Sequence, residues 1–322
     1  MSFFGKSAAR SAARRAFSGT ARPGKDKVVV TAALNGVFTD PAKFDIPVTP
    51  EEMAQAAREA YDAGATIVHI HFRDQRPGKG HLPSWEPEVA LAVANAIRER
   101  TPELLLNFTT GTIGETGPLG GGELGPVDGP ISCLRAGRPE MAALNSGSLN
   151  YLRTKKDGSW AWPPMCFQNP VEKIEAMVNA MDELNIVGEC ECFDTGIVRS
   201  IRMFEHNGLM TQPIHLSLVM GVASGMPAKA EWLPLLVEEI NPETQWQTIA
   251  IGRADDVWPL LRRTSELGGN VRTGLEDTFY RRDGSRATSS GQLIQDLVAI
   301  VRETGREPCS PEETRAAVFG GH

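Results

Sequence analysis

Two histidines, His69 and His71, stand one residue apart in an apolar, β-branched segment at residues 66–72. This segment follows a helix-like run at residues 50–63 and the helix breaker Gly64, so it is predicted to be a buried strand. Side chains alternate along a strand, and both imidazoles therefore point to the same face. Two imidazoles at the carboxyl end of a strand are suited to binding one metal ion. The alternative is a pair of core histidines satisfied by their neighbours.

A catalytic zinc site that keeps an open position needs a third ligand. Three carboxylates at the ends of predicted strands are candidates: Glu276, and the pair Glu189 and Glu191, which share one strand face. A carboxylate that faces a barrel interior is costly unless it is paired or bound to metal. Several of them together therefore favour a metal site. Zinc fits two histidines and a carboxylate best, with iron and manganese as alternatives.

The elements that must position these residues alternate between strand-like and helix-like segments along the whole chain. Strands are predicted at residues 27–33, 66–72, 103–108, 140–145, 186–193, 214–220, 245–251 and 270–273. Helices are predicted at residues 50–63, 87–100, 170–184, 195–207, 228–240, 255–267, 289–303 and 311–318. Eight strand–helix units over about 280 residues predict a single-domain (β/α)8 TIM barrel.

The main alternative fold is a doubly wound open sheet, but no G-x-G-x-x-G motif follows the first predicted strand. In a TIM barrel the catalytic groups cluster at the carboxyl ends of the strands. The Gly/Pro-rich segment at residues 111–130 is predicted to be a long loop over that face.

The first 25 residues differ from the remainder in composition. They carry six basic side chains and no acidic one, so the net charge of −7 leaves −13 on the remainder. We predict that residues 1–25 are a disordered leader, with the pattern of a transit peptide, and that residues 26–322 form the catalytic barrel. A transit peptide would direct the protein to the mitochondrial matrix; otherwise we expect it in the cytoplasm. The acidic remainder argues against nucleic-acid binding, and no apolar run is long enough for a membrane span.

Several motifs occur in one order along the chain and carry a family resemblance. They are Thr31-Ala32-Ala33, Pro47-Val48-Thr49-Pro50-Glu51-Glu52, His69-x-His71-x-Arg73-Asp74, Leu144-Asn145-x-Gly147, Val219-x-Gly221-Val222, Gly252-Arg253 and Arg272-x-Gly274-Leu275-Glu276-Asp277. Together they closely resemble the β-keto acid cleavage enzymes, of the 3-keto-5-aminohexanoate cleavage type. The resemblance runs from about residue 27 to 319.

The resemblance implies a zinc-dependent barrel enzyme, usually a homotetramer. Such an enzyme converts a β-keto acid and acetyl-CoA to acetoacetate and a new acyl-CoA by Claisen and retro-Claisen chemistry. Carried over to this chain, His69, His71 and Glu276 would bind the zinc. Asp277, partnered by Arg272, would be the base that removes a proton from the carbon between carboxylate and ketone.

Further residues are candidates for binding the two substrates. Thr109, Thr110 and Gly111 could offer hydroxyl and backbone donors to the substrate carboxylate, although each could equally stabilise its own loop. Asn145 and Glu191 are also candidate substrate contacts. For CoA, Gly225 and Arg253 could supply a backbone amide and a cation to the phosphates, with ordinary βα turns as the alternative.

Two positions bear on the side chain of the keto acid. The chain has Val37-Phe38 after its first predicted strand, where an acid is expected in enzymes that act on amino-substituted keto acids. Ala143 is also small and apolar. We therefore predict an uncharged, more apolar substrate side chain, with Phe38 in contact with it. A quaternary ammonium group is the second candidate, because Phe38, Trp160 or Trp162 could face a cation.

Two other classes of protein are alternatives. Metal-dependent hydrolases of the amidohydrolase kind also carry an H-x-H pair, but on the first barrel strand and with further histidines on later strands. Here the pair is on the second predicted strand, and His215 is the other histidine that could be a ligand. The second alternative is a non-catalytic metabolite-binding barrel, which the intact set of candidate catalytic residues argues against.

Overall fold

The computed structural model of the chain describes residues 24–37, 39–112, 127–222 and 224–319. The predicted leader therefore lies almost wholly outside the described residues, as do Phe38 and most of the predicted loop at residues 111–130. No helix within the described ranges is long and apolar enough to cross a bilayer.

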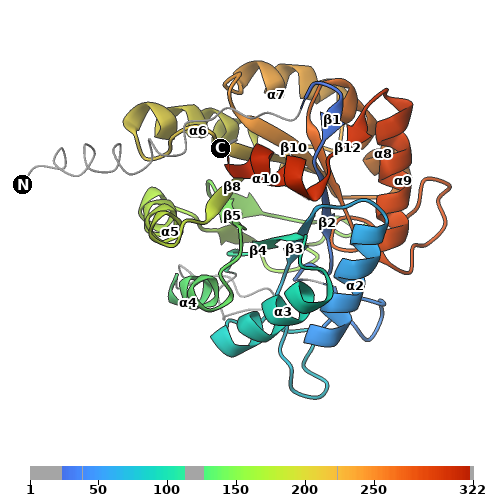
Figure 1. Cartoon of the computed structure of the whole chain (residues 1–322). Helices are drawn as coiled ribbons and strands as arrows, with labels where there is room; N and C mark the ends of the chain where they lie inside the picture. Colours follow the sequence, from blue (N-terminus) through green and yellow to red (C-terminus); the bar gives the residue numbers. More distant parts are fainter. Residues whose placement is uncertain (1–23, 38, 113–126, 223, 320–322) are drawn as a thin grey trace, which may run out of the picture.

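Eight parallel strands close into a barrel, in the order β10-β11-β2-β3-β4-β5-β8-β9 (Figure 1). Their bounds are β2 Val30–Ala33, β3 Ile67–Ile70, β4 Leu105–Phe108, β5 Met141–Asn145, β8 Val187–Cys192, β9 His215–Met220, β10 Gln245–Ala250 and β11 Asn270–Thr273. Each predicted strand overlaps one of these. The single-domain TIM barrel expected from the sequence is confirmed.

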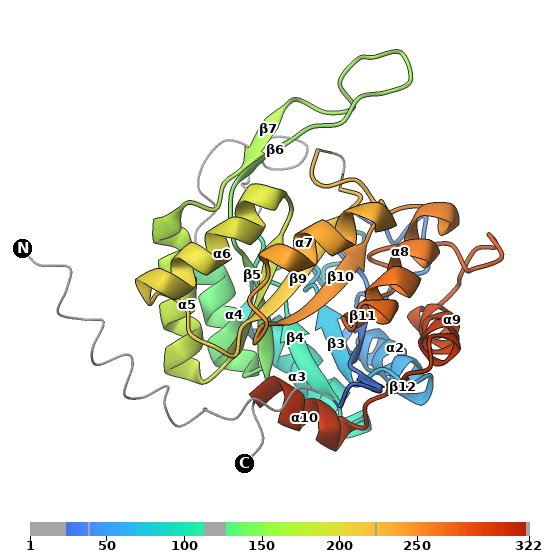
Figure 2. The ribbon, with the colours of Figure 1, turned by 90° about the horizontal axis from the view of Figure 1, so that it is seen from above.

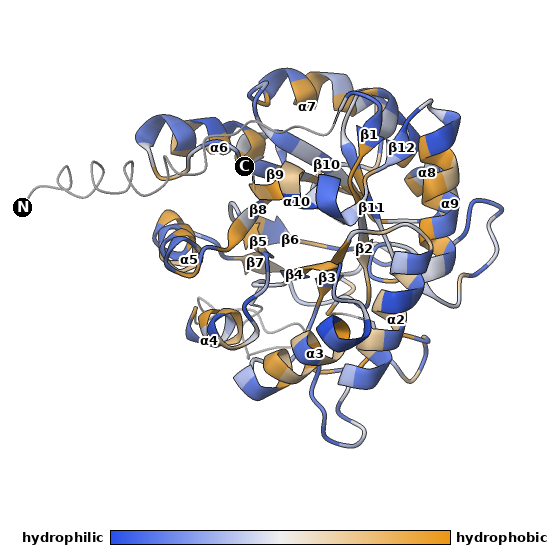
Figure 3. Cartoon of the chain, viewed as in Figure 1, coloured by the Kyte–Doolittle hydropathy of each residue, from blue (hydrophilic) through white to orange (hydrophobic). Residues whose placement is uncertain are grey.

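Helices surround the barrel and present their apolar sides to the strands, as the hydropathy colouring of Figure 3 shows. Their bounds are α2 Pro50–Asp62, α3 Pro87–Arg100, α4 Asp128–Gly137, α5 Val171–Leu184, α6 Thr195–Asn207, α7 Leu233–Glu239, α8 Ala254–Glu266, α9 Ser290–Glu303 and α10 Pro311–Phe319, with a 3-10 turn, η3, at Ala230–Trp232. The helix α4 is absent from the sequence prediction, which placed a loop up to residue 130.

The start of α2 follows directly from its sequence. Thr49 is the N-cap, and its hydroxyl accepts from the backbone N–H of Glu52 at 3.2 Å. The Glu52 carboxylate in turn accepts from the backbone N–H of Thr49 at 2.9 Å, which completes a capping box. Pro50 occupies the first helical position, where its missing N–H costs nothing.

Two pairs of short strands lie outside the barrel. β1 (Lys27–Val28) pairs in parallel with β12 (Glu307–Pro308), so the first predicted strand is in fact divided between β1 and β2. β6 (Leu149–Tyr151) and β7 (Met165–Phe167) form an antiparallel hairpin. Figure 2 shows this hairpin projecting from one end of the barrel and α10 lying across the other end.

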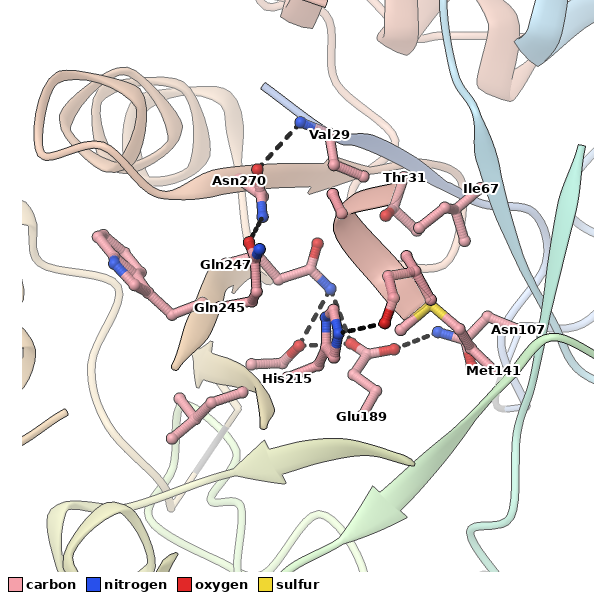
Figure 4. Close-up of a pocket in the computed structure, with 15 residues that line it drawn as sticks. Val29, Thr31, Ile67, Asn107, Met141, Glu189, His215, Gln245, Gln247 and Asn270 are labelled. Carbon is pink, nitrogen blue, oxygen red and sulfur yellow. Dashed lines mark hydrogen bonds between the residues drawn. The ribbon is translucent and has the colours of Figure 1, made fainter. Parts of the chain in front are cut away.

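The barrel interior has an apolar cluster at the amino end of the strands and a polar layer next to this cluster. Next to α10, a small cluster of apolar side chains closes the amino end of the strands; its members are Val29, Ile67, Leu105, Met141, Cys309, Ala317 and Val318. The polar layer lies beside this cluster and contains Asn107, Glu189, His215, Gln245, Gln247 and Asn270 (Figure 4).

Candidate active site at the carboxyl end of the barrel

The two predicted metal-ligating histidines and Glu276 come together at the carboxyl end of the barrel. Nε2 of His71 lies 3.3 Å from Oε1 of Glu276, and Nε2 of His69 lies 3.6 Å from Oε2. One ligand atom from each of the three residues fits within 4.8 Å of the others. Within the described ranges this is the one group of at least three His, Cys, Asp or Glu side chains with metal-site geometry.

The environment of Glu276 fits a metal ion. Its Oε2 is buried and has no hydrogen-bond partner among the described residues, although a buried carboxylate oxygen normally has one. Gly36 packs against the same side chain, because a Cβ built on Gly36 would lie 2.7 Å from Cγ of Glu276. The oxygen that lacks a protein partner is thus the one that faces His69, where a cation would satisfy it.

His71 lies one residue beyond β3, and a side chain replaces the backbone partner that it lacks there. Its N–H donates to Oδ1 of Asn35 at 3.1 Å, and Nδ2 of Asn35 donates to the carbonyl of His71 at 2.9 Å. The neighbouring strand β2 ends at Ala33 and offers no strand pairing to His71, so β3 ends at Ile70. The predicted strand at residues 66–72 is therefore too long at its carboxyl end. Asn35 fixes the direction of the second histidine.

Arg272, on β11, joins the carboxylates of the site. It donates through Nε to Oδ2 of Asp277 at 3.2 Å and through Nη2 to Oδ1 at 3.0 Å, which is a bidentate pair. The same Nη2 lies 3.0 Å from Oε1 of Glu276. Its Nη1 lies 3.8 Å from Glu191 and has no hydrogen-bond partner among the described residues.

Burial and charge set the protonation states of these groups in different directions. Burial lowers the pKa of His69 to about 3, so its imidazole is neutral, the form that binds metal. Burial opposes ionisation of Glu276, but Arg272, His71 and His69 outweigh it and hold the pKa of Glu276 well below its usual range. Burial raises the pKa of Asp277 to about 7 and, with the charge of Glu189, raises the pKa of Glu191 to about 8.

A cavity of about 180 Å³ opens beside the metal-site cluster. His69, His71, Glu276, Arg272 and Glu191 form its polar side. Its other side is mainly apolar and includes Val37, Tyr151, Met165, Phe167, Phe193 and Ile249. Tyr151, Met165 and Phe167 come from the β6–β7 hairpin, so the hairpin forms part of the wall.

The predicted substrate-binding residues divide into two groups. Thr109, Gly111, Asn145 and Glu191 all line the cavity. Thr110 does not: its hydroxyl donates to the carbonyl of Ala143 at 2.5 Å and fastens the end of β4 to β5. Ala143 lies outside the lining as well.

Asp277 also lies outside the cavity lining. Its side chain is fully buried behind Arg272 and Glu276, and both of its oxygens accept from Arg272. Glu191 is the carboxylate other than Glu276 that faces the cavity.

The predicted CoA-binding residues lie on the same face of the barrel. Arg253 is the N-cap residue of α8, and its guanidinium lies 5.1 Å from the centre of the Tyr280 ring. Gly225 packs against the backbone of Phe193, where a Cβ would lie 2.6 Å from the carbonyl oxygen. Neither residue lines the cavity, and Phe38 lies outside the described residues.

Glu189, one of the candidate ligands, is held by other side chains. It accepts hydrogen bonds from Asn107, from Ser217 and, at 2.7 Å, from Nε2 of Gln247 (Figure 4). His215, the candidate ligand of the hydrolase alternative, lies at the opposite end of the barrel with Nε2 3.2 Å from the carbonyl of Val318. Among the described residues, the site therefore lacks the further histidine that the hydrolase alternative requires.

A closed parallel barrel with a cavity and ionisable side chains at the carboxyl ends of its strands is the arrangement of TIM-barrel enzymes. A sequence model of the β-keto acid cleavage enzymes matches residues 27–318, and the chain belongs to this family. The resemblance inferred from its motifs is thus confirmed.

Two individual relatives and one solved structure are similar to this chain. The chain is 30% identical over 291 residues to the 3-keto-5-aminohexanoate cleavage enzyme of Acetoanaerobium sticklandii, and the match covers 90% of this chain and 97% of that protein. It is 29% identical over 292 residues to the 3-oxoadipate:acetyl-CoA acetyltransferase of Cupriavidus necator, covering 90% and 92%. Among solved structures, the ternary complex of ObcA with C4-CoA adduct and oxalate shares the fold, with a TM-score of 0.66 at 17% identity over 85% of this chain and 67% of that one.

Proposed function

We propose that this chain is a zinc-dependent β-keto acid cleavage enzyme that converts a β-keto acid with an uncharged side chain and acetyl-CoA to acetoacetate and a new acyl-CoA. Membership of the family supports the reaction class. The observation that carries the proposal is the cluster of His69, His71 and Glu276 beside a cavity that Arg272 also lines, with Nη1 of Arg272 lacking a hydrogen-bond partner among the described residues.

His69, His71 and Glu276 would hold the zinc, which when bound supplies a Lewis acid that polarises the keto oxygen of the substrate. Arg272 would orient the substrate, because this residue lines the cavity and its buried Nη1 has no hydrogen-bond partner among the described residues. A guanidinium presents its N–H donors in a geometry that matches a carboxylate. Thr109 and Asn145 would provide further polar contacts to the same group.

Asp277 would remove the proton from the carbon between the carboxylate and the ketone. The carbanion formed by this deprotonation attacks the thioester carbonyl of acetyl-CoA, and CoA leaves as the thiolate. The thiolate then attacks the keto carbon of the original substrate, and the bond between this carbon and the deprotonated carbon breaks. The new acyl-CoA is released, and the carbanion of acetoacetate takes its proton back from Asp277. This role requires Asp277 to turn from Arg272 to the cavity when substrate binds. Glu191 already faces the cavity and is the second candidate base.

The lining of the cavity supports an uncharged substrate side chain. Of the described residues around it, Arg272 alone carries a permanent positive charge, and that charge is shared among three carboxylates. A second substrate carboxylate, such as the name of the 3-oxoadipate enzyme indicates, would find no further cationic side chain among the described lining residues. The walls formed by Val37, Met165 and Ile249 favour burial of an apolar group instead.

The test combines metal analysis with turnover. Purified protein is incubated with acetyl-CoA and a panel of β-keto acids that carry alkyl, carboxylate, amine or trimethylammonium side chains, and acetoacetate and new acyl-CoA are followed by mass spectrometry. We expect the alkyl members to react best. Turnover of only the trimethylammonium member would support the second candidate substrate, because Tyr151, Phe167 and Phe193 could surround a cation.

Four variants assign the roles. Glu276→Ala should lose zinc and turnover together, whereas Asp277→Asn should keep zinc and lose about 10²–10⁴ in kcat. Glu191→Gln tests the second candidate base, and a larger loss in this variant than in Asp277→Asn would transfer the role to Glu191. Glu238→Ala, an exposed carboxylate on α7, is the control and should behave as the parent. Bound zinc without acyl-CoA from any keto acid would favour the hydrolase alternative.

A further inference from the structure

Two buried polar atoms on neighbouring strands lack hydrogen-bond partners among the described residues. They are Nδ1 of His69 on β3 and Oδ1 of Asn107 on β4. His69 and Asn107 are partners in the register of these two parallel strands, so their side chains leave the sheet on the same face. Leaving a buried polar atom unpaired is costly, and a pair of such atoms at adjacent positions calls for an explanation.

The orientation of the Asn107 amide follows from its other partner. Its Nδ2 donates to Oε2 of Glu189, and a carboxylate accepts hydrogen bonds but cannot donate them. The amide nitrogen must therefore face Glu189, and Oδ1 is left as a pure acceptor. Ser217 and Gln247 donate to the other oxygen of Glu189, so the carboxylate that fixes the amide is itself fixed.

The orientation of the His69 ring makes it the complement of this acceptor. Its Nε2 is the nitrogen directed at Glu276, 3.6 Å from Oε2, and is thus the atom of this ring that belongs to the metal-site cluster. A neutral imidazole that binds metal through Nε2 carries its proton on Nδ1. Nδ1 of His69 is then a donor that lacks an acceptor, beside an acceptor that lacks a donor.

We infer that Asn107 and Glu189 are positioning residues for the metal: Oδ1 of Asn107 accepts the Nδ1–H of His69, directly or through one water, when Nε2 binds the ion. This inference rests on the proposed metal site. The chain Glu189–Asn107–His69 would select the tautomer that presents the Nε2 lone pair and hold the ring at its angle to Glu276. Hydrogen bonds to the outer nitrogen of a ligating histidine commonly act in this way.

The first test removes the acceptor. In Asn107→Leu, which has nearly the same size, zinc affinity measured by competition with a chelator should fall about 10–100-fold. The matched control is Asn270→Leu, the same substitution at an asparagine of the polar layer whose side chain bonds to Val29 and Gln245. We expect its zinc affinity to stay within about threefold of the parent, since the amide of Asn107 is untouched. Melting temperatures of the metal-free proteins show whether either variant is merely less stable.

The second test restores the pattern with the groups exchanged. The double variant Asn107→Asp with Glu189→Gln keeps the net charge, an acceptor beside His69 and a donor–acceptor pair between the two positions. Zinc affinity should return to within about threefold of the parent. Asn107→Asp alone places two carboxylates together, and its zinc affinity should stay as low as that of Asn107→Leu. A double variant as weak as Asn107→Leu would overturn the inference.

The third test needs no variant and decides the matter if Asn107→Leu fails to fold. In ¹⁵N-histidine NMR spectra of the zinc-loaded parent, His69 should show a protonated Nδ1 and a metal-bound Nε2. Binding through Nδ1 would overturn the inference. A parent protein that binds no zinc contradicts the proposed function itself, whereas parent and Asn107→Leu binding zinc equally well contradicts only the role of Asn107.

Discussion

At the scale of single residues, the site depends on how one guanidinium is shared. Nη2 of Arg272 lies 3.0 Å from Oδ1 of Asp277 and 3.0 Å from Oε1 of Glu276. A planar guanidinium can serve two carboxylates at fixed angles, which a lysine ammonium on its flexible stem cannot. Arg272 thereby sets the distance between the proposed metal ligand and the proposed base.

Gly36 is the residue whose replacement tests the packing around Glu276. Its φ is +58°, and an added Cβ would meet Cγ of Glu276 at 2.7 Å. Gly36→Ala should displace the carboxylate and weaken zinc binding about tenfold. Gly284→Ala is the control, since Gly284 has φ +82° and nothing within 4 Å of the added Cβ. Both variants should lose about 1–2 kcal/mol from the left-handed backbone, measured by urea unfolding, but unchanged zinc affinity in Gly36→Ala would refute the packing argument.

The spacing of His69 and His71 predicted two members of the metal-site cluster from residue types alone. The family resemblance then selected Glu276, which lies just beyond β11, from three candidate carboxylates. Three contacts could not be predicted in this way. Asn35 bonds across 36 positions to His71, Thr110 turns to Ala143 instead of the cavity, and Asn107 is oriented by Glu189. Each depends on which strands become neighbours in the closed barrel, and local sequence does not carry that information.

At the scale of elements, the β6–β7 hairpin forms one wall of the cavity. Tyr151 lies at the end of β6, and its ring stacks on that of Trp162 with the ring centres 5.5 Å apart. Ser224, in the loop after β9, ties the hairpin down: its hydroxyl donates to the carbonyl of Asn150 and accepts from the N–H of Leu152. The wall is therefore braced on two sides.

Removing the Trp162 ring should loosen the substrate wall without disturbing the metal site. A stacked aromatic pair contributes about 1 kcal/mol beyond its buried area, which corresponds to a rise of about fivefold in KM for the keto acid in Trp162→Ala. We expect kcat and zinc content to be unchanged. Trp160→Ala is the matched control because that ring is 48% exposed. Steady-state kinetics decide the outcome, and equal KM values in the two variants would contradict this role for the hairpin.

The barrel strands were predictable because each is a short apolar run between turn residues. The elements that the prediction missed are those without such a signal. The helix α4 contains Gly129, Pro130 and Gly137, residues that disfavour a helix, and it forms because Cys133 and Leu134 are buried in the core. The strands β6 and β7 span only three residues each.

At the scale of the whole molecule, the two ends of the barrel have different tasks. The carboxyl end carries the metal-site cluster and the hairpin, while α10 covers the amino end (Figure 2). Val318 and Ala317 pack on the apolar cluster there, and Thr314 donates to Thr66 at 2.8 Å. The contacts of α10 thus stabilise the end of the barrel opposite the metal-site cluster.

Truncating Val318 should separate these tasks. Its side chain is 2% exposed, and Val318→Ala should lower the free energy of unfolding by about 2 kcal/mol. Val171→Ala, at a position that is 53% exposed, should change it by less than about 0.5 kcal/mol. Urea titrations measure both, and kcat/KM should be unaffected below the unfolding transition. A fall in kcat/KM of the folded Val318→Ala protein would show that the two ends are coupled.

The position of the hairpin has a consequence for how new specificities could arise in such a chain. Its apolar wall residues come from one excursion of about twenty residues, inserted between β5 and α5, and not from the strands that carry the ligands. Recombination or an insertion confined to this excursion could exchange one keto acid for another in a single genetic event. A directed-evolution library confined to this segment would vary the substrate specificity and leave the barrel strands and the proposed metal ligands unchanged.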